Sequence, residues 1–266
     1  MISNFKIFSM IASILMVVAI PLYVFRRYRG NMKMSQGIVW GMLAYFLYMI
    51  VRMLLLTVIT QVLPGLDASR LEGNLFLVSF VEGLLNAISF AVAASVVYRF
   101  QLRKMEDDEI PILNGLTFVM VSALFLIMPL INHVMFSFKV NSGNLDSFVS
   151  DTVTLEQVQQ VAQALKDTPG VAFLDMGLAR IFDILVYISG FIAVYFGYVY
   201  IPEEKLKYTF IGALIIFGYF MISVLSLGVF TNYPWVTIAI KGIYGLALFK
   251  VTYGYQVKVL GQSVSE

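Results

Sequence analysis

Seven long apolar stretches, separated by short polar segments, cover most of the chain. Each is about as long as an α-helix must be to cross the hydrocarbon core of a bilayer, roughly 20 residues. The pattern therefore predicts an all-α polytopic membrane protein, a bundle of about seven transmembrane helices that forms a single domain over residues 1–266. The predicted helices span residues 5–24, 37–63, 75–97, 112–136, 171–201, 208–230 and 236–255.

The loops between these stretches alternate in their content of Lys and Arg, which sets the predicted orientation. Cytoplasmic loops of membrane proteins carry the excess of Lys and Arg. We therefore expect an outer N-terminus, a cytoplasmic C-terminus and an extracellular loop at 139–170. The cytoplasmic set is Arg26, Arg27, Arg29, Lys33, Arg99, Arg103, Lys104, Lys205, Lys207 and Lys258, and the opposite set is Lys6, Arg70, Lys139 and Lys166.

Within the 139–170 loop, the sequence TLEQVQQVAQALKDTPG predicts a short amphipathic helix. Val158, Val161 and Leu165 follow one another at i, i+3 and i+7, which is one apolar face of a helix. Thr154 stands three residues before Gln157, as in a capping box. This helix is expected to rest on the membrane surface or on the bundle, or else to form a lid over a partner or substrate.

Composition supports a membrane protein and argues against several classes of metal, cofactor and nucleic-acid site. Hydrophobic residues make up 60% of the chain and charged residues 13%, against roughly 25% charged in soluble domains. The net charge of +2 does not favour a nucleic-acid partner. The chain has no cysteine and one histidine, so neither a sulfur-based nor a histidine-rich metal site is expected, and no cofactor is predicted.

Ionisable side chains inside the apolar stretches mark the candidate site. A charge near the centre of a bilayer costs a few kcal/mol, about 2.5–3.5 on insertion scales, so such residues face a protein interior or a water-filled cavity. Counted at 1.5 Å per residue, they fall in the same outer half of the membrane on four helices. Guanidinium groups are expected to bind the carboxylates. The residues are Arg52, Glu82, Arg180, Asp183 and Lys241, with Asn86 one turn from Glu82.

Two interpretations of this network stay open at this point. The charges can act as polar contacts that hold helices together. Alternatively, they line a hydrated cavity, open to the outside, that holds a binding or reacting group.

Three known intramembrane chemistries lack their motifs. The His-Glu-x-x-His sequence of zinc proteases is absent. A serine-type site would need His133 as its base, and no Gly-x-Ser-Gly surrounds a serine. The Gly-x-Gly-Asp sequence of aspartyl proteases is also absent.

Four segments carry a resemblance to a known family. WGMLAYFLYMIVRMLLL, FVEGLLN, NGLTF and ARIFDILVYI resemble motifs of the YhfC family of glutamic-type intramembrane proteases, polytopic bacterial membrane proteins distantly similar to the CAAX-protease group. The resemblance runs across nearly the whole chain. It implies a location in the bacterial cytoplasmic membrane.

The chain departs from that family at the positions that would carry catalysis. Glu82 keeps the second Glu of the family's Glu-Glu-Gly-x-Arg region, whereas the first Glu and the Arg of that region, the His of Gly-Leu-Gly-His, and the Glu and His of Glu-Arg-Ile-Phe-x-x-x-x-His are replaced. A glutamic protease needs a carboxylate to activate water and further donors for the oxyanion. The resemblance thus implies a pseudoprotease. The replaced positions are Val81 and Leu85 in FVEGLLN, Phe118 in NGLTF, and Ala179 and Tyr187 in ARIFDILVYI.

As a pseudoprotease, the chain is expected to bind a membrane protein or a peptide, as a subunit or adaptor of a membrane complex. Two alternatives remain, an active protease that uses Glu82 and a small-solute carrier or receptor that uses the polar cavity. The predicted polar-core residues are Arg52, Glu82, Asn86, Arg180, Asp183, Tyr187 and Lys241.

Overall fold

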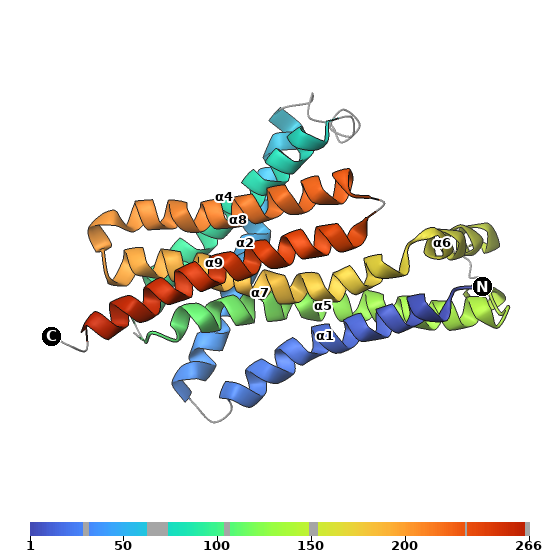
Figure 1. The fold of residues 1–266 in the computed structure, drawn as a ribbon, viewed down its shortest axis with the longest axis horizontal. Helices are drawn as coiled ribbons and strands as arrows, with labels where there is room; N and C mark the ends of the chain where they lie inside the picture. Colours follow the sequence, from blue (N-terminus) through green and yellow to red (C-terminus); the bar gives the residue numbers. More distant parts are fainter. Residues whose placement is uncertain (29–31, 63–73, 104–106, 149–153, 232, 264–266) are drawn as a thin grey trace. The chain divides into compact units, whose positions relative to one another are not determined.

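The structure is a computed structural model that describes residues 1–28, 32–62, 74–103, 107–148, 154–231 and 233–263. Over these ranges the chain is helical, with no strand, and seven helices are long and apolar enough to cross a membrane (Figure 1). The prediction of an all-α polytopic membrane protein is confirmed. The helices are α1 (Asn4–Tyr28), α2 (Met32–Val62), α4 (Leu75–Gln101), α5 (Ile110–Asn141), η1 (Asp146–Phe148), α6 (Leu155–Asp167), α7 (Gly170–Val199), η2 (Pro202–Glu204), α8 (Lys205–Val229) and α9 (Pro234–Ser263).

Most of the spanning helices are longer than the apolar stretches that predicted them, because polar residues continue the helix at the ends. At the end of α5, for example, the Asn141 side chain accepts a hydrogen bond from the backbone N–H of Ile2 at 2.6 Å and donates one to the Ile2 carbonyl at 2.9 Å. Residues 139–141, expected in the loop, therefore belong to α5. Arg29, Arg70 and Lys104, which entered the charge count, lie outside the described residues.

The helices group into two compact units, and each is described by itself. The first unit contains residues 1–22 and 123–181, and the second contains residues 23–122 and 182–266. Three helices, α1, α5 and α7, contribute residues to both units.

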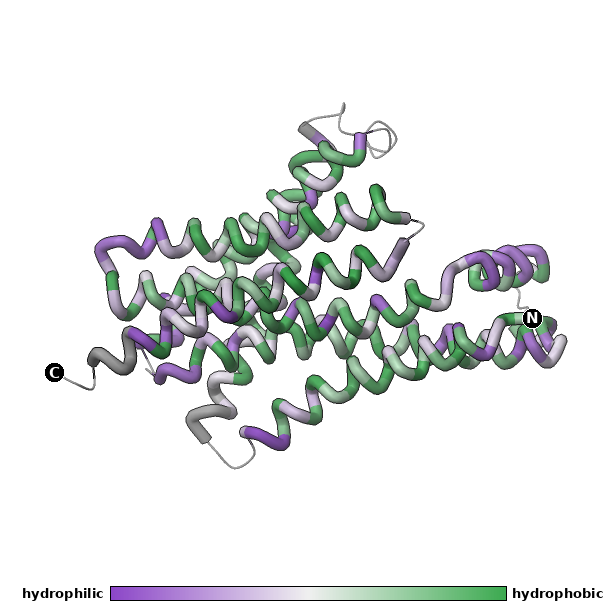
Figure 2. The backbone as a smooth tube through the Cα atoms, in the orientation of Figure 1, coloured by the Kyte–Doolittle hydropathy of each residue, from purple (hydrophilic) through white to green (hydrophobic). Residues whose placement is uncertain are grey.

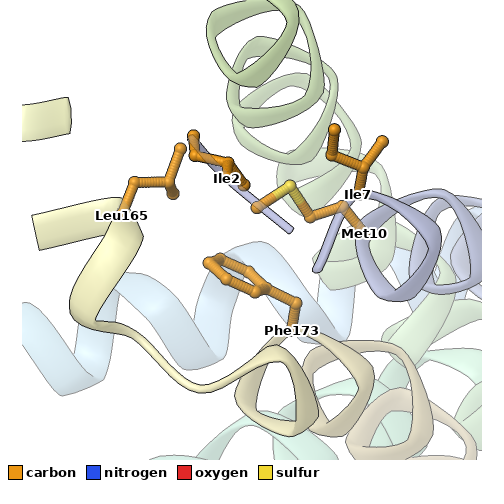
Figure 3. Packing of buried hydrophobic residues seen from close by; sticks show 5 residues of the cluster. All are labelled: Ile2, Ile7, Met10, Leu165 and Phe173. Carbon is orange, nitrogen blue, oxygen red and sulfur yellow. The ribbon is translucent and has the colours of Figure 1, made fainter. Parts of the chain in front are cut away.

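An apolar cluster at the N-terminus holds the first unit together (Figure 3). Ile2, Ile7 and Met10 pack with Leu165 of α6 and Phe173 of α7. Hydrogen bonds support the same contacts. The Lys6 ammonium donates to the carbonyl of Lys166 in the last turn of α6, where carbonyls lack partners within the helix.

Helix α6 is the predicted amphipathic helix, and it is mainly hydrophilic along its length (Figure 2). Its capping box is confirmed, because the Thr154 hydroxyl accepts from the Gln157 N–H at 3.3 Å and the Gln157 side chain accepts from the Thr154 N–H at 2.9 Å. The predicted apolar face is wrong in one position. Ala162 is buried with Val158 and Leu165, whereas the Val161 side chain is 52% exposed. Residues at i+3 and at i+4 both lie on the same helix face as residue i. Contacts with the rest of the unit bury the residue at i+4, Ala162, and leave the residue at i+3, Val161, exposed.

In the second unit, α4 packs on α8 and on α2, and α8 packs on α9. Glycines allow the backbones to approach closely, as is usual for membrane helices. A Cβ atom on Gly83 would lie 3.0 Å from the ring and the carbonyl of Phe217 in α8. These contacts place the polar residues of α2 and α4 in the same unit as Asp183 of α7 and Lys241 of α9.

Candidate functional site

An ion pair between α2 and α4 is the centre of the candidate site. Nη2 of Arg52 donates to Oε2 of Glu82 at 2.9 Å. The two side chains are 30% and 35% exposed, and the Nε atom of Arg52 is buried without a hydrogen-bond partner among the described residues. The expected binding of Glu82 by a guanidinium group is therefore present, with Arg52 as the donor.

Asn86 extends this ion pair into the interior of the unit. It lies one turn after Glu82 on α4 and is almost completely buried. Its Nδ2 donates to the Glu82 carbonyl at 2.7 Å and lies 3.3 Å from the Glu82 carboxylate. Its Oδ1 accepts a hydrogen bond from the Tyr48 hydroxyl of α2. Arg52, Glu82, Asn86 and Tyr48 thus form one hydrogen-bonded chain across two helices.

Aromatic rings cover the inner end of this chain. The Tyr48 ring contacts Phe118 of α5, with centroids 5.2 Å apart, and Tyr187 of α7 at 6.5 Å. Phe118 and Tyr187 contact each other at 4.3 Å, and both are buried. Phe90 of α4 adds a further ring at 5.8 Å from Tyr187. The polar chain consequently ends against a packed aromatic cluster.

A second buried polar group lies on α7 and α8. The Asp183 side chain is 6% exposed and accepts a hydrogen bond from the Tyr219 hydroxyl at 2.8 Å. Lys241 of α9 is 5% exposed. The next residue of α9, Gly242, lies against the ring of Phe182, the neighbour of Asp183 in sequence. Helix α9 therefore meets α7 next to this carboxylate.

The structure brings together three of the predicted residues directly, since Arg52, Glu82 and Asn86 share hydrogen bonds. Tyr187 joins them through Tyr48. Arg180 belongs to the first unit, so its expected pairing with the carboxylates stays a prediction. The same holds for the expected place of Lys241 in the network.

Sequence reasoning missed Tyr48 and Tyr219, which both donate to predicted residues. Tyr48 had a usable signal, because it precedes Arg52 by four residues and so lies on the same helix face. Tyr219 had none, because α8 carries several aromatic residues at similar depth and its partner Asp183 is on another helix.

Among the described residues, this site presents a guanidinium, a carboxylate, an amide and a phenol hydroxyl that are already hydrogen-bonded to one another. The carboxylate of Glu82 is engaged by Arg52 and Asn86, and the neighbouring buried positions 118 and 187 carry a phenyl and a phenol ring. Among the residues that the structure describes, no three His, Asp or Glu side chains gather where they could hold a metal ion.

The other positions that the family resemblance relates to catalysis carry apolar side chains. Leu85 is buried within α4, and Val81 and Ala179 are half-buried.

Comparisons of the chain with protein-family models, with curated proteins and with solved structures return no match.

Proposed function

We propose that this chain is a membrane-embedded binding protein that resembles an intramembrane protease and lacks its hydrolytic activity. Its partner is a helix of another membrane protein or a peptide within the bilayer, and the chain acts as a subunit or adaptor of a membrane complex. The polar contact surface is the chain of Arg52, Glu82, Asn86 and Tyr48.

The observation that carries the proposal is the contact between Phe118 and Tyr187. These two residues occupy the positions at which the resembled family has histidines, and they come from helices α5 and α7. In the structure their ring centroids are 4.3 Å apart, and Tyr48 links them to the Glu82 chain. Positions far apart in sequence therefore meet at Tyr48, which is hydrogen-bonded to Asn86 of the Glu82 chain. A phenyl ring cannot take up a proton, and a phenol with an ordinary pKa of about 10 is a poor general base near neutral pH, which supports the loss of hydrolytic activity.

Partial exposure of the Arg52–Glu82 pair supports binding by the same residues. About a third of each side chain is exposed, although both residues lie within helices that are long and apolar enough to cross a membrane. Charged groups in lipid are unfavourable unless water or polar groups surround them. A partner that offers a hydroxyl, amide or carboxylate to the guanidinium of Arg52 would satisfy this requirement.

The proposed lack of proteolytic activity is tested with purified protein in proteoliposomes and a panel of transmembrane peptides. We expect that neither the wild-type protein nor Glu82→Gln cleaves any of the peptides. Proteolysis that disappears in Glu82→Gln but persists in Glu204→Gln, a matched exposed carboxylate on η2, would establish an active protease instead.

The test of binding uses a partner identified by crosslinking in native membranes and then purified. We expect Arg52→Gln to weaken the association measured with the purified partner, because it removes the exposed guanidinium. Arg99→Gln, at the end of α4, serves as the control and should bind like wild type. Equal affinity of the Arg52→Gln and wild-type proteins for the partner would show that these charges do not belong to the binding surface.

A further inference from the structure

A pocket of about 360 Å³ lies between α7, α8 and α9, close to the C-terminal end of α9. Its aliphatic lining includes Ile192, Ile211 and Val251. Phe196 contacts two tyrosines that also line the pocket, Tyr208 at 6.4 Å and Tyr255 at 5.1 Å between centroids. This pocket is remote in sequence and in lining residues from the Arg52–Glu82 site, and the proposed function makes no use of it.

The wall of the pocket on α9 is open. Gly254 lines the pocket, and a Cβ atom added to it would meet no other atom within 4 Å. Val251 and Tyr255, one turn apart on the same helix, are 69% and 48% exposed. The pocket is therefore open along this face of α9.

The polar end of the pocket is cationic. Among the described residues that line it, Lys258 is the charged one, and none is a carboxylate. The Lys207 ammonium lies 5.7 Å from the ring centroid of Tyr208 and pairs with Glu204 at 2.7 Å, so this ion pair adds no net charge beside the pocket and the positive charge there is that of Lys258. A pocket lined by aliphatic and aromatic side chains and by one lysine, near the end of a helix that can cross a membrane, matches an amphiphile with an anionic head.

We propose that this pocket binds an anionic phospholipid. The phosphate lies at Lys258 beside the hydroxyls of Tyr208 and Tyr255, and the first part of an acyl chain lies over Ile211 and Val251. Basic pockets between transmembrane helices at the membrane surface are known to hold anionic headgroups, and each Lys near the surface adds about 1 kcal/mol, or about fivefold in affinity. The lipid comes from the leaflet at the C-terminal end of α9.

The experiment titrates purified protein in neutral detergent with phosphatidylglycerol, phosphatidylcholine or inorganic phosphate and follows the thermal midpoint. A ligand that binds only the folded protein raises this midpoint in a saturable manner. We expect phosphatidylglycerol to do so, and phosphatidylcholine and phosphate to have little effect. Lys258→Gln should weaken the apparent affinity for phosphatidylglycerol about fivefold, and Gly254→Leu, which fills the pocket, should remove the saturable shift.

Two matched variants control for charge and for volume. Lys250→Gln removes an exposed lysine of α9 that does not line the pocket. Ala91→Leu fills the separate apolar groove between α4 and α8, which has no charged residue in its lining. Both should respond to phosphatidylglycerol like wild type. Equal shifts with the two lipids, or a wild-type response of both Lys258→Gln and Gly254→Leu, would overturn the proposal. If Gly254→Leu does not fold, Lys258→Gln decides, since its side chain is exposed.

Discussion

At the scale of single residues, the interior of the second unit is organised by hydrogen bonds to carboxylates. Glu82 is bound by Arg52 and Asn86, and Asp183 by Tyr219. Removal of one partner leaves the other without its charge-assisted hydrogen bond, which is more harmful than removal of both. The two groups differ in burial, because Asp183 is nearly inaccessible whereas the Arg52–Glu82 pair is partly exposed.

A double-mutant cycle tests the Arg52–Glu82 contact. Glu82→Ala should lower the free energy of unfolding in detergent by about 1–3 kcal/mol, since the Arg52 guanidinium and the Asn86 amide then lose their acceptor. The double variant Glu82→Ala with Arg52→Ala should recover part of this loss, by about 0.5–3 kcal/mol. Thermal midpoints from scanning fluorimetry measure all four species.

Arg99→Ala, an exposed residue at the end of α4, is the control and should change little. If Glu82→Ala melts like wild type, the carboxylate is fully hydrated. A solute-binding cavity would then explain the charges better than a contact between helices.

At the scale of helices, close approach at glycine decides which faces meet. Gly41 of α2 shows this most clearly, because a Cβ atom there would overlap Oγ1 of Thr117 and lie 3.0 Å from the Asn114 carbonyl in α5. The same region of α5 is fixed by a buried amide pair, in which Asn114 Nδ2 donates to Gln101 Oε1 at 2.8 Å. The contact between α2 and α5 therefore depends on the absence of a side chain at position 41.

Gly41→Ala should separate the two helices and destabilise the protein by about 1–3 kcal/mol, the usual effect of overpacking. Thermal unfolding in detergent measures it. Gly254→Ala is the matched control, because open space surrounds that position and alanine favours a helix over glycine by about 1 kcal/mol. Gly41→Ala with Thr117→Ala should regain part of the loss, and a Gly41→Ala protein as stable as wild type would contradict the contact.

At the scale of the whole molecule, the sequence predicts on which side of the membrane each end of α5 lies. Asp107 precedes this helix and Ser142 follows it, and a helix of 32 residues is long enough to separate the two on opposite sides of a membrane. The excess of Lys and Arg assigns the Asp107 end to the cytoplasm.

Single cysteines test this directly, because the chain contains none. Ser142→Cys should react with an impermeant maleimide on intact cells, and Asp107→Cys should react only after the membrane is opened. Lys139→Cys on the outer side and Lys205→Cys on the inner side should follow the same division. Labelling of Asp107→Cys alone from outside would invert the topology.

The sequence by itself determined the helices, because hydrophobic length and helix capping are local properties of the chain. Seven apolar stretches predicted the seven spanning helices, and Thr154 with Gln157 predicted the start of α6. Depth within the membrane likewise follows from residue counts along one helix. Glu82 and Asn86, one turn apart, could be placed on the same face for this reason.

Only the tertiary structure decided which residues meet. Arg52 and Arg180 were equally suitable partners for Glu82 by depth, and the packing of α2 on α4 brought Arg52 to 2.9 Å. Tyr219 reached Asp183, and Phe118 reached Tyr187, across helices whose relative rotation leaves no local signal in the sequence. That rotation is set by the sum of many side-chain and glycine contacts along each helix pair, and a different rotation would bring other side chains together.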